Sequence, residues 1–190
     1  DGVEREWCDD DVLRQLRRRS LASLRREVEP VDAGTLARFL PRWHGIDSRR
    51  RGIDALVEVI AQLQGAPLVA STLDRDVLGA RLVDHRPSDL DELCTAGEVV
   101  WVGAGAIGSG DGRIRLAFRD QAAALLAPTE DFEPEPIHEA LLAHLDERGA
   151  SFWTDLVAAA REAGERDDEA SVLAALWDLV WAGLVTNDSL

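Results

Sequence analysis

Hydrophobic residues recur every three or four positions along most of the chain, a pattern typical of helices that pack on one face. The clearest stripe ends at Gly65 and comprises Ile53, Leu56, Val57, Ile60 and Leu63. Similar spacing predicts further helices over 10–28, 32–40, 71–78, 88–96, 120–127, 137–148, 152–163 and 167–182. Side chains placed to cap three of these helices are Asp32, Ser151 and Asp167. The pattern therefore predicts a mostly helical protein.

The hydrophobic period changes from 3.6 to 2 after residue 98, which indicates strands. Residues 99–102 form a β-prone run, and a second alternating run has Ile114, Leu116 and Phe118, with arginines at 113, 115 and 119. The segment between them, 103–112, is rich in glycine and predicts a turn with a flexible tip. We therefore expect a β-hairpin over 98–119.

Two parts of the chain share a sequence pattern. Residues 90–99 and 176–185 both read Leu-x-x-Leu-x-x-Ala-Gly-x-Val, and Gly65-Ala66 recurs as Gly149-Ala150. Two matches at nearly one spacing indicate a tandem repeat. Three helices followed by a hairpin is the order of a winged helix, a relative of the helix-turn-helix.

The expected fold class is therefore mostly α with a small β-hairpin, arranged as tandem winged-helix domains behind an N-terminal helical segment. An acidic stretch punctuated by prolines separates the two domains. The second domain is expected to stop soon after a strand begins at Val185-Thr186. The predicted divisions are an Arg-rich helical segment at 1–51, a first winged helix at 52–127, a linker at 128–136 and a truncated second winged helix at 137–190.

The net charge of −15 is unevenly distributed, and every one of the 21 basic residues is Arg. There are 12 Arg against 10 acidic residues in 1–51, 6 against 11 in 52–127, and 3 against 15 in 128–190. Phosphate contacts are therefore expected only from Arg-rich places, and the alternative for these side chains is a solvated surface with weak ion pairs. The candidates are Arg14, Arg18, Arg25, Arg49, Arg50, Arg51, Arg113 and Arg115.

Trp177 and Trp181 lie four residues apart on the last predicted helix, so they are neighbours on its surface. The acidic residues around them disfavour contact with DNA. Two interpretations remain open. The tryptophans pack into the core of their own unit, or they form an aromatic patch that meets a partner.

Several motifs suggest chemistry that their context excludes. The string GxGxxG at 103–108 is followed by a strand, whereas a dinucleotide site needs a helix there. His138 and His144 are six residues apart, about 240° around a helix, and cannot share a metal ion. Cys8 and Cys94 are isolated, which disfavours a disulfide framework or a zinc site and fits a reducing cytosol. We nominate no catalytic residue, metal ligand or membrane span.

Methionine is absent, which indicates a piece cut from a longer protein. Five longer stretches of the sequence carry a family resemblance. They are residues 16–30, 36–43, 62–67, 90–101 and 176–188, and the last, LWDLVWAGLVTND, is the most specific. Together they resemble the C-terminal region of the bacterial large helicase-related (Lhr) family, particularly its versions from high-GC, actinobacterial-looking genomes. The resemblance covers essentially the whole chain.

The resemblance implies a parent that is an ATP-dependent superfamily 2 helicase, moves 3′ to 5′ on single-stranded DNA, unwinds RNA:DNA hybrids and serves DNA repair. Its C-terminal extension is expected to be a row of winged helices with a β-barrel, similar to DNA glycosylases and implicated in oligomerisation. This chain has no GxxxxGK[ST] loop and no DExH box, so ATP and Mg²⁺ are implied only for the parent.

The expected role is a non-catalytic module of a cytoplasmic, nucleoid-associated helicase. Its expected partners are other domains of the parent, single-stranded DNA or an RNA:DNA hybrid, or a second copy of the chain. The alternatives are a scaffold for assembly without DNA contact, or part of a glycosylase-like region.

Overall fold

The computed structural model describes residues 9–27, 30–126, 132–164 and 168–190. The chain divides into two compact units, Asp1–His44 and Gly45–Leu190, which are described separately. No helix in the described ranges is both long and apolar enough to cross a membrane.

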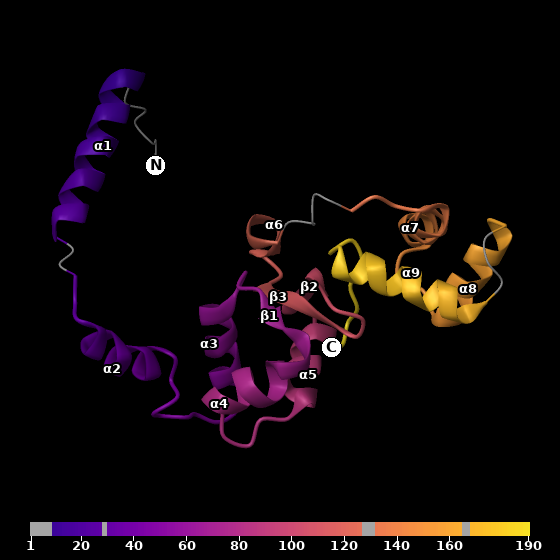
Figure 1. Cartoon of the computed structure of the whole chain (residues 1–190), viewed down its shortest axis with the longest axis horizontal. Helices are drawn as coiled ribbons and strands as arrows, with labels where there is room; N and C mark the ends of the chain where they lie inside the picture. Colours follow the sequence, from indigo (N-terminus) through magenta and orange to yellow (C-terminus); the bar gives the residue numbers. More distant parts are fainter. Residues whose placement is uncertain (1–8, 28–29, 127–131, 165–167) are drawn as a thin grey trace, which may run out of the picture. The chain divides into compact units, whose positions relative to one another are not determined.

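The first unit contains α1 (Asp10–Glu27) and α2 (Ala33–Trp43), both of which the hydrophobic spacing predicts (Figure 1). Asp32 caps α2 as expected, because its carboxylate accepts a hydrogen bond from the backbone N–H of Thr35 at 2.9 Å. The helix continues past Pro41, where an end was expected, and closes with the bond from the N–H of His44 to the carbonyl of Leu40.

The second unit begins with a three-stranded antiparallel sheet packed on helices (Figure 1). In chain order its elements are α3 (Ile53–Leu63), β1 (Leu68–Val69), η1 (Ala70–Thr72), η2 (Leu73–Leu78), α4 (Gly79–Arg81), α5 (Pro87–Thr95), β2 (Val99–Ile107), β3 (Asp111–Phe118) and α6 (Ala122–Leu125). The order helix, strand, two helical segments and hairpin is that of a winged helix, with strand order β1-β3-β2. We call the β2–β3 hairpin the wing.

The predicted hairpin is confirmed, but the prediction of a turn over 103–112 is wrong. Strand β2 continues through Gly103 to Ile107, with a break in the pairing register between Gly103 and Ala106. Only residues 108–110 connect the strands. The glycine-rich motif therefore lies mainly within a strand.

The core beneath the sheet joins the helices to the two long strands. Its largest solvent-free side chains are Leu56, Ile60, Leu73, Leu78, Leu90, Val99, Ile114 and Leu116. They come from α3, the composite helix η1–α4, α5 and the wing. This arrangement buries the stripe that the sequence shows before Gly65.

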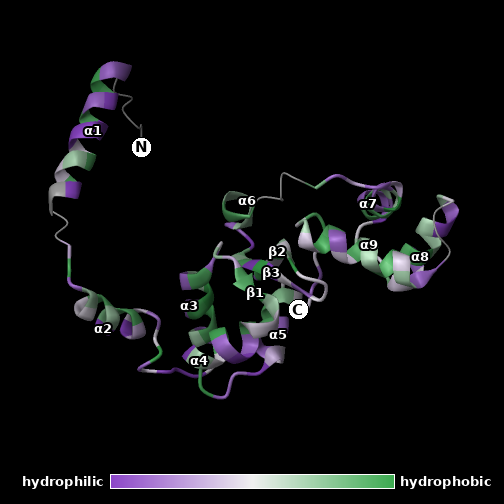
Figure 2. Ribbon diagram, in the orientation of Figure 1, coloured by the Kyte–Doolittle hydropathy of each residue, from purple (hydrophilic) through white to green (hydrophobic). Residues whose placement is uncertain are grey.

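Three further helices pack around a second hydrophobic cluster. They are α7 (Pro136–Arg148), α8 (Trp153–Glu162) and α9 (Glu169–Trp181), and hydrophobic residues run along α9 (Figure 2). The prediction that Ser151 caps α8 is wrong, because its hydroxyl donates to the carbonyl of Gly149 and Phe152 holds the cap position. The other predicted cap, Asp167, lies outside the described residues, and Asp168 caps α9.

Helices α5 and α9 end in the same way, at the residues of the shared sequence pattern. Gly97 and Gly183 follow the two helices with φ angles of 72° and 77°, a left-handed conformation that glycine adopts without strain. Backbone bonds of 3.0 Å, from Glu98 to Leu93 and from Leu184 to Leu179, close the two turns. The repeat is thus a shared helix ending.

The two clusters meet through α9. Val180, on α9, is buried in the core of the winged helix, and Val185 packs against both clusters. The strand expected at Val185-Thr186 is absent from the described residues 182–190. The hydroxyl of Thr186 and the indole N–H of Trp101 hold this segment through single bonds instead of a backbone ladder.

Candidate nucleic-acid and partner surfaces

The C-terminal turn of α9 lies against the wing at two glycines. A Cβ atom added to Gly103 would overlap the carbonyl of Val180 and come within 2.9 Å of the Cα of Trp181. A Cβ on Gly112 would overlap the indole ring of Trp181 and come within 2.6 Å of its Cδ2 atom. Side chains at either position would separate α9 from the wing, so the glycines permit this contact.

The segment after α9 continues across α5. The hydroxyl of Thr95 donates to the carbonyl of Asp188 at 3.2 Å, and the N–H of Leu190 donates to the carboxylate of Asp91 at 2.9 Å. Between these contacts, the indole N–H of Trp101 donates to the carbonyl of Ser189 at 3.0 Å. One face of α5 is therefore occupied by the chain itself.

Helix α5 is the third helix of the winged helix, the element that reads the DNA groove in helix-turn-helix proteins. It carries Asp89, Asp91 and Glu92 and has no Arg or Lys. Arg86, just before it, lies 3.7 Å from Asp89. The negative charge opposes approach to phosphate, so α5 is poorly suited to enter a groove. The same conclusion can be reached from the sequence, because residues 87–95 contain no Arg.

The wing arginines lie on the sheet face opposite the core. Arg113 and Arg115 alternate along β3 with Ile114 and Leu116, which are fully buried. Arg113 is exposed and Arg115 is half-buried. The outer face of the wing therefore presents two of the predicted phosphate contacts on one rigid strand.

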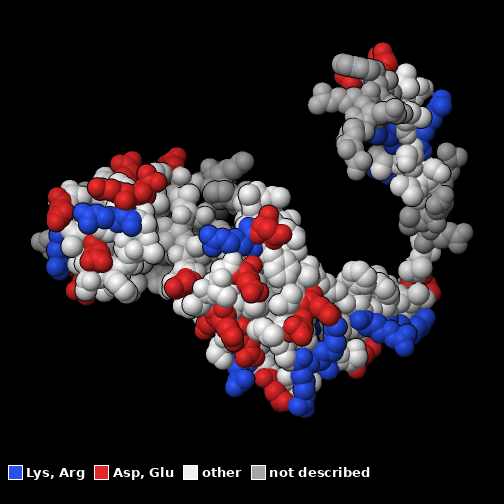
Figure 3. Space-filling view, turned by 180° about the vertical axis from the view of Figure 1, so that it is seen from behind, with Lys and Arg blue, Asp and Glu red and all other residues white. Residues whose placement is uncertain are grey.

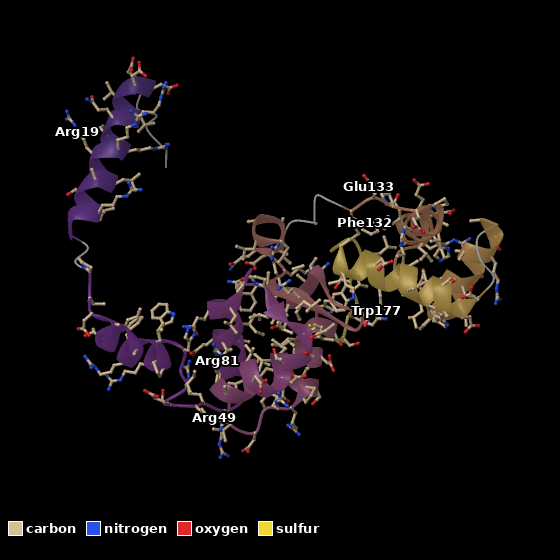
Figure 4. The ribbon with its side chains drawn as sticks, viewed as in Figure 1. Arg19, Arg49, Arg81, Phe132, Glu133 and Trp177 are labelled. Atoms are coloured by element: carbon tan, nitrogen blue, oxygen red, sulfur yellow. The ribbon has the colours of Figure 1, made fainter. Side chains whose placement is uncertain are left out.

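The arginine triplet at 49–51 has structural partners within its own unit. Arg49 donates to the carbonyl of Gly79 at 2.7 Å and to that of Leu82, which fastens this segment to the end of α4 (Figure 4). Arg50 pairs with Glu58, and Arg51 lies 3.3 Å from Asp84. The Arg50 and Arg51 side chains remain 58% and 73% exposed, whereas Arg49 has a role in the fold.

The remaining arginine candidates, Arg14, Arg18 and Arg25, lie on α1, where all described side chains are exposed. Arg14 lies 3.3 Å from Asp11 one turn earlier, an exposed pair that contributes little to stability. These three residues belong to the first unit and the wing arginines to the second. The candidates are therefore divided between the two units.

Trp177 and Trp181 stack on each other with ring centroids 5.2 Å apart and an angle of 21° between planes. Trp181 is half-buried against Gly112. Trp177, labelled on α9 in Figure 4, is 46% exposed. Trp181 thus packs inside the second unit, against the wing. Trp177, beside the equally exposed Leu173, keeps an open surface.

Titratable groups in the described ranges form no metal cluster of three or more His, Cys, Asp or Glu. Burial, with help from the carboxylates of Asp91 and Asp188, raises the pKa of the Cys94 thiol to about 11. A thiol with so high a pKa is a poor nucleophile at neutral pH. Cys94 therefore belongs to the core, while Cys8 lies outside the described residues.

Sequence reasoning missed an aromatic pair on α2. Phe39 and Trp43 stack with ring centroids 5.5 Å apart, and both side chains are more than half exposed. Arg38 and Arg42 precede them on the same helix. The spacing of four residues between the two rings is the signal that identifies such a pair.

Comparisons with known proteins agree with this architecture. Residues 31–119 match a family model described as the winged-helix domain of the large helicase-related protein. The chain is 44% identical over 185 residues to the Lhr helicase/probable uracil glycosylase of Mycolicibacterium smegmatis, a match covering 97% of the chain and 12% of that protein. It is 34% identical over 200 residues to the Lhr helicase/uracil glycosylase of Escherichia coli, covering 96% of the chain and 13% of that protein. The chain thus spans about an eighth of the length of these curated relatives.

Proposed function

Because the chain belongs to the large helicase-related (Lhr) protein family and contains its winged-helix domain, we propose that it is a non-catalytic architectural module of an ATP-dependent helicase that serves DNA repair. The observation that carries this proposal is the contact of α9 with Gly103 and Gly112. This contact ties two helical cores into one body. Such a body can hold neighbouring domains of the parent at a fixed separation.

Helices α7–α9 constitute a second winged-helix unit in this proposal. Support comes from the shared endings of α5 and α9 and from the matching glycines after α3 and α7, Gly65 and Gly149, with φ angles of 71° and 74°. Close packing of one unit on the wing of the other restricts the motion between them.

In this proposal, contact with duplex nucleic acid comes from arginines that project away from the two cores. Arg113 and Arg115 on the outer face of the wing are best placed, with Arg50, Arg51 and the arginines of α1 as additional contacts. The acidic α5 does not read a groove. Such contacts neutralise phosphates without selecting a base sequence.

Catalysis belongs to other parts of the parent. The chain carries no phosphate-binding loop, so we assign ATP and Mg²⁺ to the helicase core, at work on the chromosome in the cytoplasm. The glycosylase activity in the relatives' names has no candidate residue among the described side chains. We assign it to a region beyond this chain.

A second candidate function is assembly, which Trp177 and Leu173 favour. Both are 46% exposed and lie four residues apart on α9, so they form one apolar strip. Another domain of the parent or a second copy of the chain could cover it. Sedimentation of the chain with Trp177→Ala tests this role, because loss of a dimer would support it.

Duplex binding tests the nucleic-acid part of the proposal. The 190-residue chain is titrated into a fluorescein-labelled 20-base-pair duplex at several salt concentrations. Changing Arg113 and Arg115 to Gln should make the log–log salt slope shallower by about 1.8, whereas the matched control Arg75→Gln should leave it unchanged. An unchanged slope in the wing variant would refute contact through the wing.

A further inference from the structure

Helix α2, in the first unit, carries a pair of exposed aromatic side chains. Phe39 and Trp43 are 51% and 58% exposed, and their rings stack at 5.5 Å with an angle of 28° between planes. Leu36 and Leu40, 47% and 41% exposed, border the pair on the same face. Because the two rings stack on each other, a planar ligand would stack on the outer face of one ring, not across both.

Basic side chains flank this surface. Arg38 and Arg42 each precede an aromatic residue by one position. They therefore lie about 100° around the helix from the rings, on the adjacent strip of its surface. Both are exposed, and basic side chains gather on α2 (Figure 3). One Nη atom of Arg38 donates to the Thr35 hydroxyl at 3.1 Å, which steadies the group and leaves its other donors available.

No carboxylate lies within α2, although the chain as a whole has a net charge of −15. The nearest in the sequence, Asp32, accepts bonds from the N–H and hydroxyl of Thr35 at the opposite end of the helix from Trp43. Hydrogen bonds from Thr35 lower the pKa of Asp32 and keep it engaged in the cap. The surface of α2 is therefore cationic and aromatic at once.

The same chain contains a second stacked pair in the opposite electrostatic setting. Trp177 and Trp181 on α9 are also four residues apart, but Asp178 lies beside them and Trp181 packs against Gly112. That pair has one exposed ring and an acidic neighbour. The pair on α2 has two exposed rings and two basic neighbours. Its surroundings therefore favour an anionic ligand, whereas those of the pair on α9 do not.

We infer that α2 is a stacking platform for single-stranded nucleic acid. Aromatic rings bind unpaired bases through their π faces, and adjacent arginines neutralise the phosphates that connect those bases. Bases in a duplex are already stacked on each other, so a duplex would engage only the arginines. This site belongs to the first unit and the wing to the second. It rests on the proposed function and extends it to single-stranded nucleic acid, which the wing arginines do not distinguish from a duplex.

Fluorescence anisotropy of a labelled 12-nucleotide oligo(dT) tests the inference with the whole 190-residue chain. Changing Phe39 and Trp43 together to Ala should weaken binding by about tenfold or more. Changing Arg38 and Arg42 together to Gln should make the log–log salt slope shallower by about 1.4. Trp43→Phe should retain most of the affinity, because it keeps an aromatic face. Circular dichroism at 222 nm checks that the variants keep their helices.

Matched controls separate this site from general effects. Trp177→Ala removes the exposed ring of the acidic pair and should leave oligo(dT) binding unchanged. Equal loss in Trp177→Ala and the α2 variant, or no loss in either, would overturn the inference. A second result would also overturn it. If the parent chain sediments as a dimer, and the variant changed at Phe39 and Trp43 is a monomer that binds oligo(dT) as well as the parent, then α2 is a protein interface. Failure of the wing proposal shows instead in the duplex titration with Arg113 and Arg115.

Discussion

The carbonyl of Val180 on α9 lies directly against the backbone of Gly103 on β2, where no Cβ atom could fit. This contact joins a helix of one hydrophobic cluster to a strand of the other. Gly112 makes the second close contact between the wing and α9, against the ring of Trp181. The glycines of the wing therefore act in packing between the two hydrophobic clusters of the second unit, and they connect the sequence to the proposed architectural function.

Alanine at Gly103 or Gly112 is expected to destabilise the fold. The added methyl would overlap Val180 or Trp181, and overpacking of this kind costs about 2 kcal/mol. The free energy of unfolding from urea titration measures the effect. Gly110→Ala serves as the matched control, because open space surrounds that position, and its change should stay within about 0.5 kcal/mol.

Arg49→Ala should lower the free energy of unfolding by about 2 kcal/mol, because it removes charge-assisted bonds to the carbonyls of Gly79 and Leu82, at the two ends of α4. Arg75→Ala removes an exposed pair with the adjacent Asp76 and should cost no more than about 0.5 kcal/mol. Equal effects in urea denaturation would show that Arg49 has no special role in the fold.

Cys94 should react slowly with iodoacetamide at pH 8, measured in a Cys8→Ser background so that one thiol remains. Its raised pKa of about 11 leaves roughly one thiolate per thousand at that pH, and burial limits access. Reaction should become fast in urea. Because the native state holds the neutral thiol, stability from this group is present below pH 9 and declines as pH rises toward 11. Rapid alkylation of the native chain at pH 8 would contradict the buried position.

The carboxylate of Asp111 should make the stability of the folded chain fall as the pH is lowered. The hydroxyl of Ser71 donates to its carboxylate at 2.6 Å and, together with the N–H of Gly112, lowers the pKa of Asp111 below 3.8. The native state therefore favours the ionised form, so this contribution is present above pH 3.8 and is lost as pH falls through the lowered value. Melting temperatures at pH 5 and pH 3 should differ less in Asp111→Asn than in the parent chain. The exposed Asp120→Asn variant is the control and should keep the full difference.

Local periodicity predicted the helices well where burial follows from nearby residues. The stripe from Ile53 to Leu63 became α3, and the residues around Leu90 and Leu179 became the buried faces of α5 and α9. The Asp32 cap was equally predictable, because its partner Thr35 is three residues away. In each case the interaction lies within one helix.

Features that depend on distant parts of the chain could not be predicted. Gly103 looked like part of a turn, because nothing near it in the sequence reveals that Val180 packs against it. A single helix was expected over 71–78, but the segment 70–81 begins as a 3₁₀ turn and widens into a π-helix before α4. The candidate arginines were chosen by residue type and local charge, and the bonds of Arg49 to Gly79 and Leu82 appear only in three dimensions.

The central claim is that helices α3–α5 with the wing, and helices α7–α9, move as one rigid body through the contact of α9 with the wing. Relaxation of backbone ¹⁵N nuclei tests it most directly, because it reports the rotational correlation time of each amide. The account predicts the same correlation time for amides of α3 and α5 as for those of α7 and α8. Two distinct times, with the helices of the second cluster tumbling faster, would contradict it.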